Sequence, residues 1–210
     1  MEYADMEKIY QRIGPDEIPW NIEEPPKELV ELVETGIMQP CRTIDMGCGT
    51  GNYAVYLAGN GFDVTAVDIS PTAIKIAEEN AAKRGVACQF IAADVLGDLA
   101  EVEGKFDFAY DWELLHHIYP EQRRQYVQNV YKKLHPEGRY LSLCFSEKNP
   151  QFGGSGKYRE TPIGTVLYFS SEDELRELFE PHFRIDELRT IEVRGKYAPH
   201  LVVYALMTRE

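Results

Sequence analysis

Acidic residues end several short apolar runs between residues 45 and 111 of this 210-residue chain, and a glycine-rich stretch follows the first of them. The acids are Asp45, Asp68, Asp94 and Asp111, and the stretch is Gly47-Cys48-Gly49-Thr50-Gly51-Asn52. Glycine has no Cβ, so such a turn can adopt positive φ and let a ligand approach the backbone. The helix predicted after it offers free N–H groups and a positive dipole end. The pattern indicates a site for the polar part of a nucleotide-like cofactor.

The second acid and the glycine spacing narrow the class of cofactor. Asp68 lies roughly 20 residues after the turn, where an acid can accept both ribose hydroxyls. A dinucleotide fingerprint has a third glycine where this chain has Asn52, and a pyrophosphate is repelled by a carboxylate such as Asp45. A cofactor with an ammonium and a sulfonium group tolerates that acid. S-adenosylmethionine is therefore favoured over NAD, and an NAD-linked oxidoreductase and a non-catalytic cofactor-binding module are the competing hypotheses.

The elements that must position these residues alternate between strand and helix. Because strands and helices alternate, an α/β sheet that is parallel for most of its width is predicted. In such a sheet ligands bind at the carboxyl ends of the strands, so the four acids are expected around one crevice. The predicted strands are 42–46, 62–68, 88–92, 106–110, 139–145, 184–193 and 201–207, and the predicted helices are 6–13, 27–34, 52–59, 70–83, 122–134 and 171–179.

Five segments, in this order, resemble the motifs of the class I S-adenosylmethionine-dependent methyltransferases. The resemblance covers about residues 27–146 and rests on Ile44–Gly51, Val64–Ser70, Ala93–Val95, Phe106–Asp111 and Leu134–Arg139. It implies a Rossmann-like, doubly wound, seven-stranded, mostly parallel sheet with an antiparallel terminal strand. A weaker likeness to the thiopurine, thiol and halide methyltransferases rests on Pro19-Trp20, on the acid after the fourth strand and on the glycine-rich stretch after the fifth.

The resemblance also implies roles for individual residues. The glycines would lie under the methionine part, Asp45 near its ammonium, and Asp68 at the ribose. Ile69 would pack on the adenine, with Asp94 and the Val95 N–H at its polar edge, while Asp111 and Trp112 would border the methyl end. The expected cofactor-binding residues are Trp20, Asp45, Gly47, Cys48, Gly49, Gly51, Asn52, Asp68, Ile69, Asp94, Val95, Asp111 and Trp112.

Methyl transfer is an in-line displacement, so the protein must align the reactants, exclude water and remove a proton where there is one. Trp20 and Trp112 could stabilise the sulfonium charge through their ring faces. The expected catalytic residues are His116, as a general base, and Asp111; His117 is the alternative base, and a structural role for the histidine pair is the competing interpretation. The expected acceptor is a small-molecule thiol, halide or similar nucleophile, with O- or N-methylation as the alternative.

The whole chain is interpreted as one methyltransferase domain. Residues 1–26 are expected to form an N-terminal lid, residues 27–146 the cofactor-binding core, and residues 147–210 a lid loop followed by the terminal strands. The lid loop, about 147–164, is predicted to be irregular because it contains Phe152-Gly153-Gly154-Ser155-Gly156.

Charge and composition exclude several partners. The net charge of −13 argues against nucleic acid, because phosphate binding needs a basic face. No apolar run approaches the roughly 20 residues that cross a bilayer, and the N-terminus lacks an apolar signal core, so a cytoplasmic location is expected. The four cysteines are scattered without a CxxC pair, which predicts neither a zinc site nor a disulfide framework. The sequence gives no indication of the oligomeric state.

Overall fold

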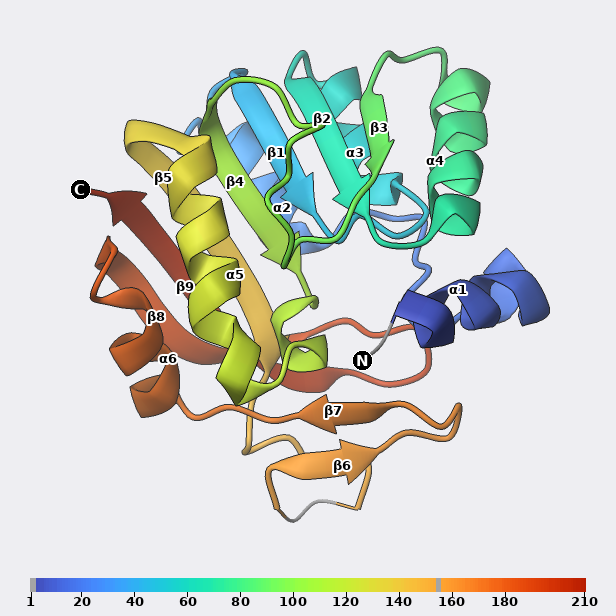
Figure 1. The fold of residues 1–210 in the computed structure, drawn as a ribbon, viewed down its shortest axis with the longest axis vertical. Coiled ribbons are helices and arrows are strands. Elements are labelled where there is room, and N and C mark those ends of the chain that lie inside the picture. Colours follow the sequence, from blue (N-terminus) through green and yellow to red (C-terminus); the bar gives the residue numbers. More distant parts are fainter. Residues whose placement is uncertain (1–2, 154–155) are drawn as a thin grey trace.

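A computed structural model of the chain describes residues 3–153 and 156–210. Its centre is a twisted seven-stranded sheet in the order β3-β2-β1-β4-β5-β9-β8 (Figure 1). β9 is antiparallel to both of its neighbours, and the other six strands share one direction, which confirms the predicted fold class. The strands of this sheet are β1 (Arg42–Met46), β2 (Asp63–Asp68), β3 (Gln89–Ala92), β4 (Phe106–Trp112), β5 (Leu134–Phe145), β8 (Phe183–Val193) and β9 (His200–Arg209).

Local sequence explains where the helices begin and end. Ser70 caps α4 by accepting a hydrogen bond from the Ala73 N–H at 3.1 Å, and Gly85 ends that helix with φ +67°. Ser171 and Glu174 form a capping box at the start of α6. The helices are α1 (Tyr3–Arg12), α2 (Lys27–Glu34), α3 (Asn52–Gly59), α4 (Pro71–Arg84), α5 (Pro120–Lys133) and α6 (Glu172–Phe179), with short 3-10 turns η1 (Pro15–Glu17) and η2 (Leu115–His117). None of the helices in the described ranges is long and apolar enough to span a membrane.

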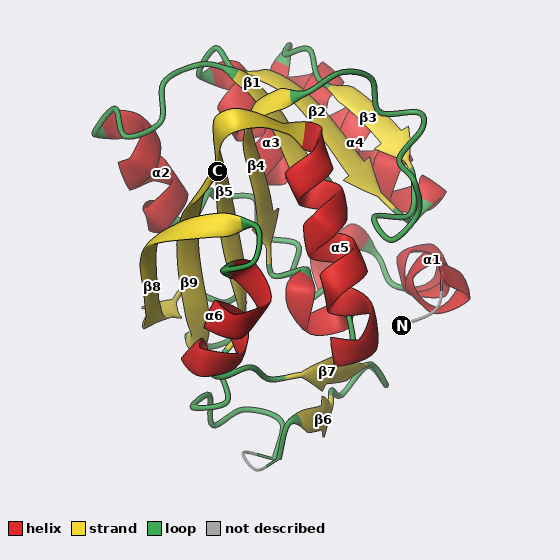
Figure 2. Ribbon diagram, turned by 60° about the vertical axis from the view of Figure 1, so that its left-hand side comes forward, coloured by secondary structure: helices red, strands yellow, loops and turns green. Residues whose placement is uncertain are grey.

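Both faces of the sheet are covered, as expected where most strands are parallel. Tyr126 and Val130 of α5 and Phe179 of α6 pack on one face. Leu29 of α2 and Leu57 of α3 pack on the other. Figure 2 shows α5 and α6 on one side of the strands and α2 on the opposite side. The strands are therefore fixed from both sides, and their carboxyl ends form a rigid edge.

That edge is where the first acids meet. In the register of the sheet, Asp45 pairs with Ala66 of β2 on one side and with Tyr110 of β4 on the other. In Figure 1 the arrowheads of β1, β2 and β4 point towards α1, which lies across this end of the sheet. Residues of the N-terminal segment, β1, β2 and β4 can therefore contribute to one site.

The segment predicted as an irregular lid loop, about 147–164, is irregular in most of its described residues, but a short hairpin begins within it. β6 (Tyr158–Glu160) pairs with β7 (Val166–Tyr168), and residues 154–155 of the glycine-rich stretch lie outside the described residues. Arg159 is buried, stacks over the Phe169 ring at 4.0 Å and donates hydrogen bonds to backbone carbonyls that include those of Glu147, Asn149 and Gln151. A guanidinium satisfied by several carbonyls holds this connection in place, which composition alone does not reveal.

Candidate functional site

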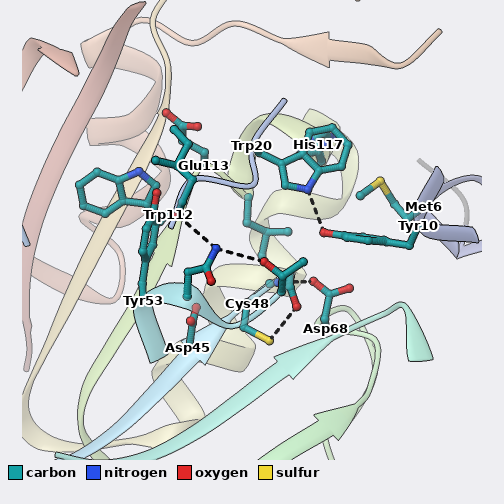
Figure 3. Close-up of a pocket in the computed structure, with 16 residues that line it drawn as sticks. Met6, Tyr10, Trp20, Asp45, Cys48, Tyr53, Asp68, Trp112, Glu113 and His117 are labelled. Carbon is teal, nitrogen blue, oxygen red and sulfur yellow. Dashed lines mark hydrogen bonds between the residues drawn. The ribbon is translucent and has the colours of Figure 1, made fainter. Parts of the chain in front are cut away.

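A cavity of about 680 Å³, part of it open to solvent, lies at the carboxyl ends of β1, β2 and β4 (Figure 3). We call it the glycine lobe, because the glycine turn forms its floor. Its lining residues are Met6, Tyr10, Trp20, Ile22, Asp45, Gly47, Cys48, Gly49, Thr50, Asn52, Tyr53, Asp68, Trp112, Glu113, Leu114 and His117.

A second lobe adjoins the first, and we call it the Asp94 lobe. It brings together Ile69 after β2, Asp94 and Val95 after β3, and residues near the start of α5. The two lobes form one elongated site, because they share the lining residues Met6, Gly47, Asp68, Leu114 and His117. Most residues predicted to bind the cofactor therefore line this site.

The glycine turn needs glycine for two reasons. Gly47 has φ +81° and Gly49 has φ +53°, a region that side chains with a Cβ rarely adopt. A Cβ on Gly47 would come within 2.7 Å of a methyl group of Leu114, and one on Gly49 within 2.9 Å of the Tyr10 hydroxyl. The glycines therefore let the backbone of the turn approach Leu114 and Tyr10 closely.

Gly51 does not line either lobe, contrary to the prediction. It caps α3 with φ +73°, and a Cβ there would come within 2.7 Å of Ala77 and 2.9 Å of Phe90. Its role is therefore to let α3 and α4 approach each other. The neighbouring Asn52 does line the glycine lobe, and its amide donates to Asn21 at 2.7 Å, which ties the turn to the N-terminal segment.

Asp68 is buried between the two lobes and is held by backbone donors. It accepts hydrogen bonds from the Gly49 N–H at 2.8 Å and the Ser70 N–H at 2.9 Å. Burial raises the pKa of its carboxyl, and these backbone N–H donors, which favour the charged form, partly oppose that effect. The carboxylate is thus fixed in orientation at the junction of the lobes.

Asp45 is the second buried acid of the glycine lobe, with 3% of its surface exposed. It accepts a hydrogen bond from the Tyr110 hydroxyl at 2.6 Å. Burial raises the pKa of its carboxyl to about 8, although the Tyr110 hydrogen bond opposes this, and the charges of Asp68 and Asp111 raise it further. At neutral pH this carboxyl is mostly protonated, and a positive ligand group beside it would favour its ionised form.

The charges around the site have one sign. Asp45, Asp68 and Glu113 line the glycine lobe and Asp94 the other lobe, whereas no described lining residue is Lys or Arg. A pyrophosphate would meet carboxylates without a basic partner here, so the site does not suit NAD. A ligand that carries an ammonium and a sulfonium group fits it. Among residues 3–153 and 156–210, no group of three or more His, Cys, Asp or Glu side chains is placed to hold a metal ion.

Asp111 lies away from the site, and the prediction that it borders the methyl end is corrected. Its side chain is fully buried on the α5 face of the sheet, where it accepts hydrogen bonds from Tyr126 at 3.0 Å, from Ser142 at 3.2 Å and from Tyr140. Successive side chains of a strand point to opposite faces, so Asp111 faces away from Trp112, which lines the lobe. Burial raises the pKa of Asp111 to about 6, and its role is structural.

His116 is also directed away from the cavity, which corrects its prediction as the general base. Its ring stacks on Phe145 at 4.4 Å, and its Nδ1 accepts a hydrogen bond from the Phe145 N–H at 3.4 Å. The adjacent His117 lines both lobes instead. Burial lowers the pKa of His117 to about 4, so this ring is neutral at physiological pH.

Four residues of the N-terminal segment, Met6, Tyr10, Trp20 and Ile22, line the glycine lobe, and their action as a lid stays a prediction. Glu7 accepts hydrogen bonds from the Ser70 and Thr72 hydroxyls at the start of α4, at 2.5 and 2.6 Å. The Trp20 indole donates to the Tyr10 hydroxyl at 2.8 Å, and its ring meets His117 edge-on at 6.0 Å. By contrast, no described residue of 147–164 lines either lobe, so this part of the predicted lid does not border the site.

Three lining residues carry features that the sequence interpretation missed. Tyr10 was expected only as part of the N-terminal lid, and neither Tyr53 nor Glu113 was among the expected site residues. Tyr53 meets the Trp112 ring edge-on at 5.7 Å, and Glu113 is hydrogen-bonded to His200, a residue of β9. The pairing of Glu113 with a residue 87 positions later has no local sequence signal.

Comparisons with known proteins agree with this geometry. A family model for a methyltransferase domain matches residues 44–138. A 2-heptyl-1-hydroxyquinolin-4(1H)-one methyltransferase of Mycobacteroides abscessus is 30% identical over 189 residues, which cover 87% of this chain and 77% of that protein. The chain belongs to the class I S-adenosylmethionine-dependent methyltransferases. A probable thiol methyltransferase of Arabidopsis thaliana is 30% identical over 129 residues, covering 60% of this methyltransferase and 56% of the plant protein.

Solved structures share the fold. One of them concerns the conversion of a disulfide bond into a thioacetal group during echinomycin biosynthesis, and it superposes with a TM-score of 0.83 at 26% identity. The superposition covers 100% of this chain and 93% of that chain. The 1,6-didemethyltoxoflavin-N1-methyltransferase of Burkholderia thailandensis, with bound 1,6-didemethyltoxoflavin and S-adenosylhomocysteine, gives 0.67 at 22% identity over 99% of this chain and 83% of that chain. S-adenosylmethionine is the cofactor of this family, and the acidic site described above is compatible with its positive groups.

The high pKa of Asp45 predicts a pH-dependent stability. Between about pH 4, the usual pKa of an aspartate, and its folded-state pKa of about 8, the folded chain holds a proton that the unfolded chain has released. Stability therefore falls as the pH rises through this window. Asp45→Asn cannot titrate, so the difference in unfolding free energy between pH 5 and pH 8 should shrink by about 2–4 kcal/mol in urea denaturation. Asp63→Asn, an exposed change at the other end of β2, should keep the wild-type difference; an unchanged difference in Asp45→Asn would contradict the assignment.

Proposed function

We propose that this methyltransferase transfers the methyl group of S-adenosylmethionine to a thiol or hydroxyl group of a small, largely apolar acceptor. The observation that carries the proposal is the division of the glycine lobe. Two buried carboxylates, Asp45 and Asp68, stand on one side, and the rings of Trp20, Trp112 and His117 stand on the other (Figure 3). The first side suits a cationic cofactor, and the second suits an aromatic or apolar acceptor.

The relatives support this choice of acceptor. The Mycobacteroides abscessus protein is named for a hydroxyquinolinone, the Arabidopsis thaliana protein for a thiol, and the echinomycin structure for sulfur chemistry. Oxygen and sulfur nucleophiles are thus represented among the proteins that resemble this chain. N-methylation is the second candidate, and the Burkholderia thailandensis enzyme named for it is similar in fold.

The cofactor is proposed to lie along both lobes. Asp68, fixed at their junction by two backbone N–H groups, would accept the ribose hydroxyls. Asp45 would face the ammonium group. Ile69, Asp94 and Val95 would hold the adenine in the second lobe. Cys48 and Asn52, which line the first lobe, would lie beside the methionine part, and Trp20 and Trp112 would stand between it and the acceptor.

The protein's contribution to the reaction would be alignment, exclusion of water and stabilisation of charge. Tyr10 and Trp20 cover the glycine lobe and are joined by a hydrogen bond, so the N-terminal segment limits access of water. The faces of Trp20 and Trp112 can stabilise a nearby positive sulfur by cation–π attraction. Cys48 would not act as a nucleophile, because burial raises the pKa of its thiol well above the usual range.

Binding of the product tests the cofactor assignment. Asp68→Ala removes a charged acceptor for two ribose hydroxyls, so the Kd for S-adenosylhomocysteine should rise by about 100-fold or more. Isothermal titration calorimetry measures this directly, with circular dichroism to confirm that the variant is folded. The matched control is Asp63→Ala, which changes an exposed aspartate at the other end of β2 and should leave the Kd within about twofold. A Kd for Asp68→Ala close to wild type would contradict the assignment.

A screen of acceptors tests the reaction. Transfer of radioactive methyl from S-adenosylmethionine should occur to aromatic thiols or hydroxylated heteroaromatics in a panel that also contains iodide, simple amines and carboxylates. The aromatic wall of the lobe is the reason for this preference. Transfer to amines alone would favour N-methylation. Tight binding of the cofactor without methyl transfer to any compound of the panel would contradict the proposed reaction.

A further inference from the structure

Glu113 has a backbone conformation that side chains rarely adopt. It follows β4 with φ +65°, and its N–H donates to the Leu143 carbonyl at 2.9 Å, which anchors the turn to β5. Non-glycine residues in this region persist where the surrounding structure holds them, and they cluster at functional sites. Here the conformation belongs to an acidic residue that is among those lining the glycine lobe.

A histidine from β9 is paired with this carboxylate. Oε1 of Glu113 is hydrogen-bonded to Nε2 of His200, and the two side chains are only 15% and 8% exposed. A carboxylate accepts, so Nε2 of His200 is the donor of this bond. Burial lowers the pKa of His200, but the hydrogen bond and the charge of Glu113 raise it above the usual value, with a smaller contribution from the Ala198 backbone. The buried pair therefore favours the charged forms of both side chains.

The pair borders the side of the lobe assigned to the acceptor. Figure 3 shows Glu113 on the same side as Trp20, Trp112 and His117, across from Asp45 and Asp68. Its negative charge contributes, after burial, to raising the pKa of the Tyr53 phenol, which places the two groups close together. The titratable groups around the pair are His200 from β9, Tyr53 from α3, Asp45 from β1, and His116 and His117 from η2.

The other titratable groups are less suited to take a proton from an acceptor. His116 and Asp111 face away from the cavity. Asp45 and Asp68 are proposed to hold the cofactor. His117 also lines the lobe, but taking a proton would place a positive charge on a buried ring whose Nδ1 has no hydrogen-bond partner among the described residues. Among the described lining residues, Glu113 therefore combines a carboxylate with a position on the acceptor side, and only its Oε1 is engaged.

We propose that Glu113 removes the proton from the acceptor's O–H or S–H group, with His200 as a positioning residue that holds the carboxylate. The proposal rests on the function proposed above. In the step, Oε2 of Glu113 takes the proton while a lone pair of the acceptor oxygen or sulfur forms the bond to the methyl carbon. The carbon–sulfur bond of the cofactor breaks, and its electron pair returns to that sulfur. The carboxyl group then releases the proton to solvent.

The substrate class follows from this role. An acceptor that is already an anion, such as a halide or a thiolate, needs no base, whereas a neutral hydroxyl or thiol does. The acceptors that benefit from the Glu113–His200 pair are therefore protonated at the working pH. This narrows the thiol or halide expected from the sequence to a protic oxygen or sulfur nucleophile.

Glu113→Gln tests the role of the carboxylate. The change keeps the size of the side chain and an oxygen that can accept from His200. At pH 7.5, kcat for benzyl mercaptan, which is mostly protonated, should fall by about 100-fold. With thiophenol, which is mostly ionised at this pH, kcat should stay within about threefold of wild type. The Kd for S-adenosylhomocysteine should not change, and the exposed control Glu192→Gln should match wild type with both thiols. An equal loss with both thiols, or no loss with either, would overturn the proposal.

His200→Gln tests the positioning role. Its kcat for benzyl mercaptan should fall by about tenfold without a change in KM, and the acid limb of its pH profile should shift, which a purely structural change would not cause. Nitrogen-15 NMR of the imidazole gives a readout that needs no acceptor. The wild-type His200 ring should be an imidazolium at pH 7.5 and become neutral in Glu113→Gln. A neutral His200 ring in the wild-type protein would overturn the proposal. If the wild-type protein has an imidazolium at His200 but methylates no acceptor, only the proposed function is refuted.

Discussion

The site depends on the burial of two carboxylates at one edge of a parallel sheet. Asp45 and Asp68 end neighbouring strands, and no described Lys or Arg lines the cavity that they share. Burying an unpaired charge is unfavourable, so Asp45 holds its proton up to about pH 8 and Asp68 relies on two backbone N–H groups. A ligand with a positive charge would compensate the buried negative charge. The two acids thereby link the stability of the fold to the binding of a cationic cofactor, and they make both stability and binding depend on pH.

The other parts of the structure maintain this acidic cavity. The glycine turn keeps the floor open, and α1 covers it through the hydrogen bonds of Glu7 to α4 and of Tyr10 to Trp20. The connection between β8 and β9 and the first residue of β9 contact two parts of the site. Lys196 donates to the carbonyls of Ile18 and Asn21 at 3.0 and 3.2 Å, and His200 is paired with Glu113. The N-terminal segment and the last strand, which are far apart in sequence, thus meet around one site.

The sequence predicted the framework well, because periodicity and turn residues are local signals. Six of the seven strands of the main sheet were expected within two residues of their observed bounds, whereas β5 begins at Leu134, five residues before the predicted start. The glycine turn with Asp45 and Asp68 could be recognised from spacing. Asp111 was misplaced because a position at the end of a strand does not reveal which face the side chain takes. His116 was preferred to His117 although adjacent residues in a turn point in different directions. The β6–β7 hairpin and the Glu113–His200 pair depend on contacts between distant segments, which periodicity cannot report.

The central claim, that the cofactor site is built on a protonated Asp45 which ionises beside the ligand, can be measured by proton release. A bound ammonium group lowers the pKa of this carboxyl from about 8, so binding of S-adenosylhomocysteine at pH 7 should release close to one proton, and affinity should increase as the pH rises towards 8. Calorimetry in two buffers of different ionisation enthalpy gives the number of protons. The account predicts about 0.9 for the wild type and near zero for Asp45→Asn. No release by the wild type, or equal release by both proteins, would contradict it.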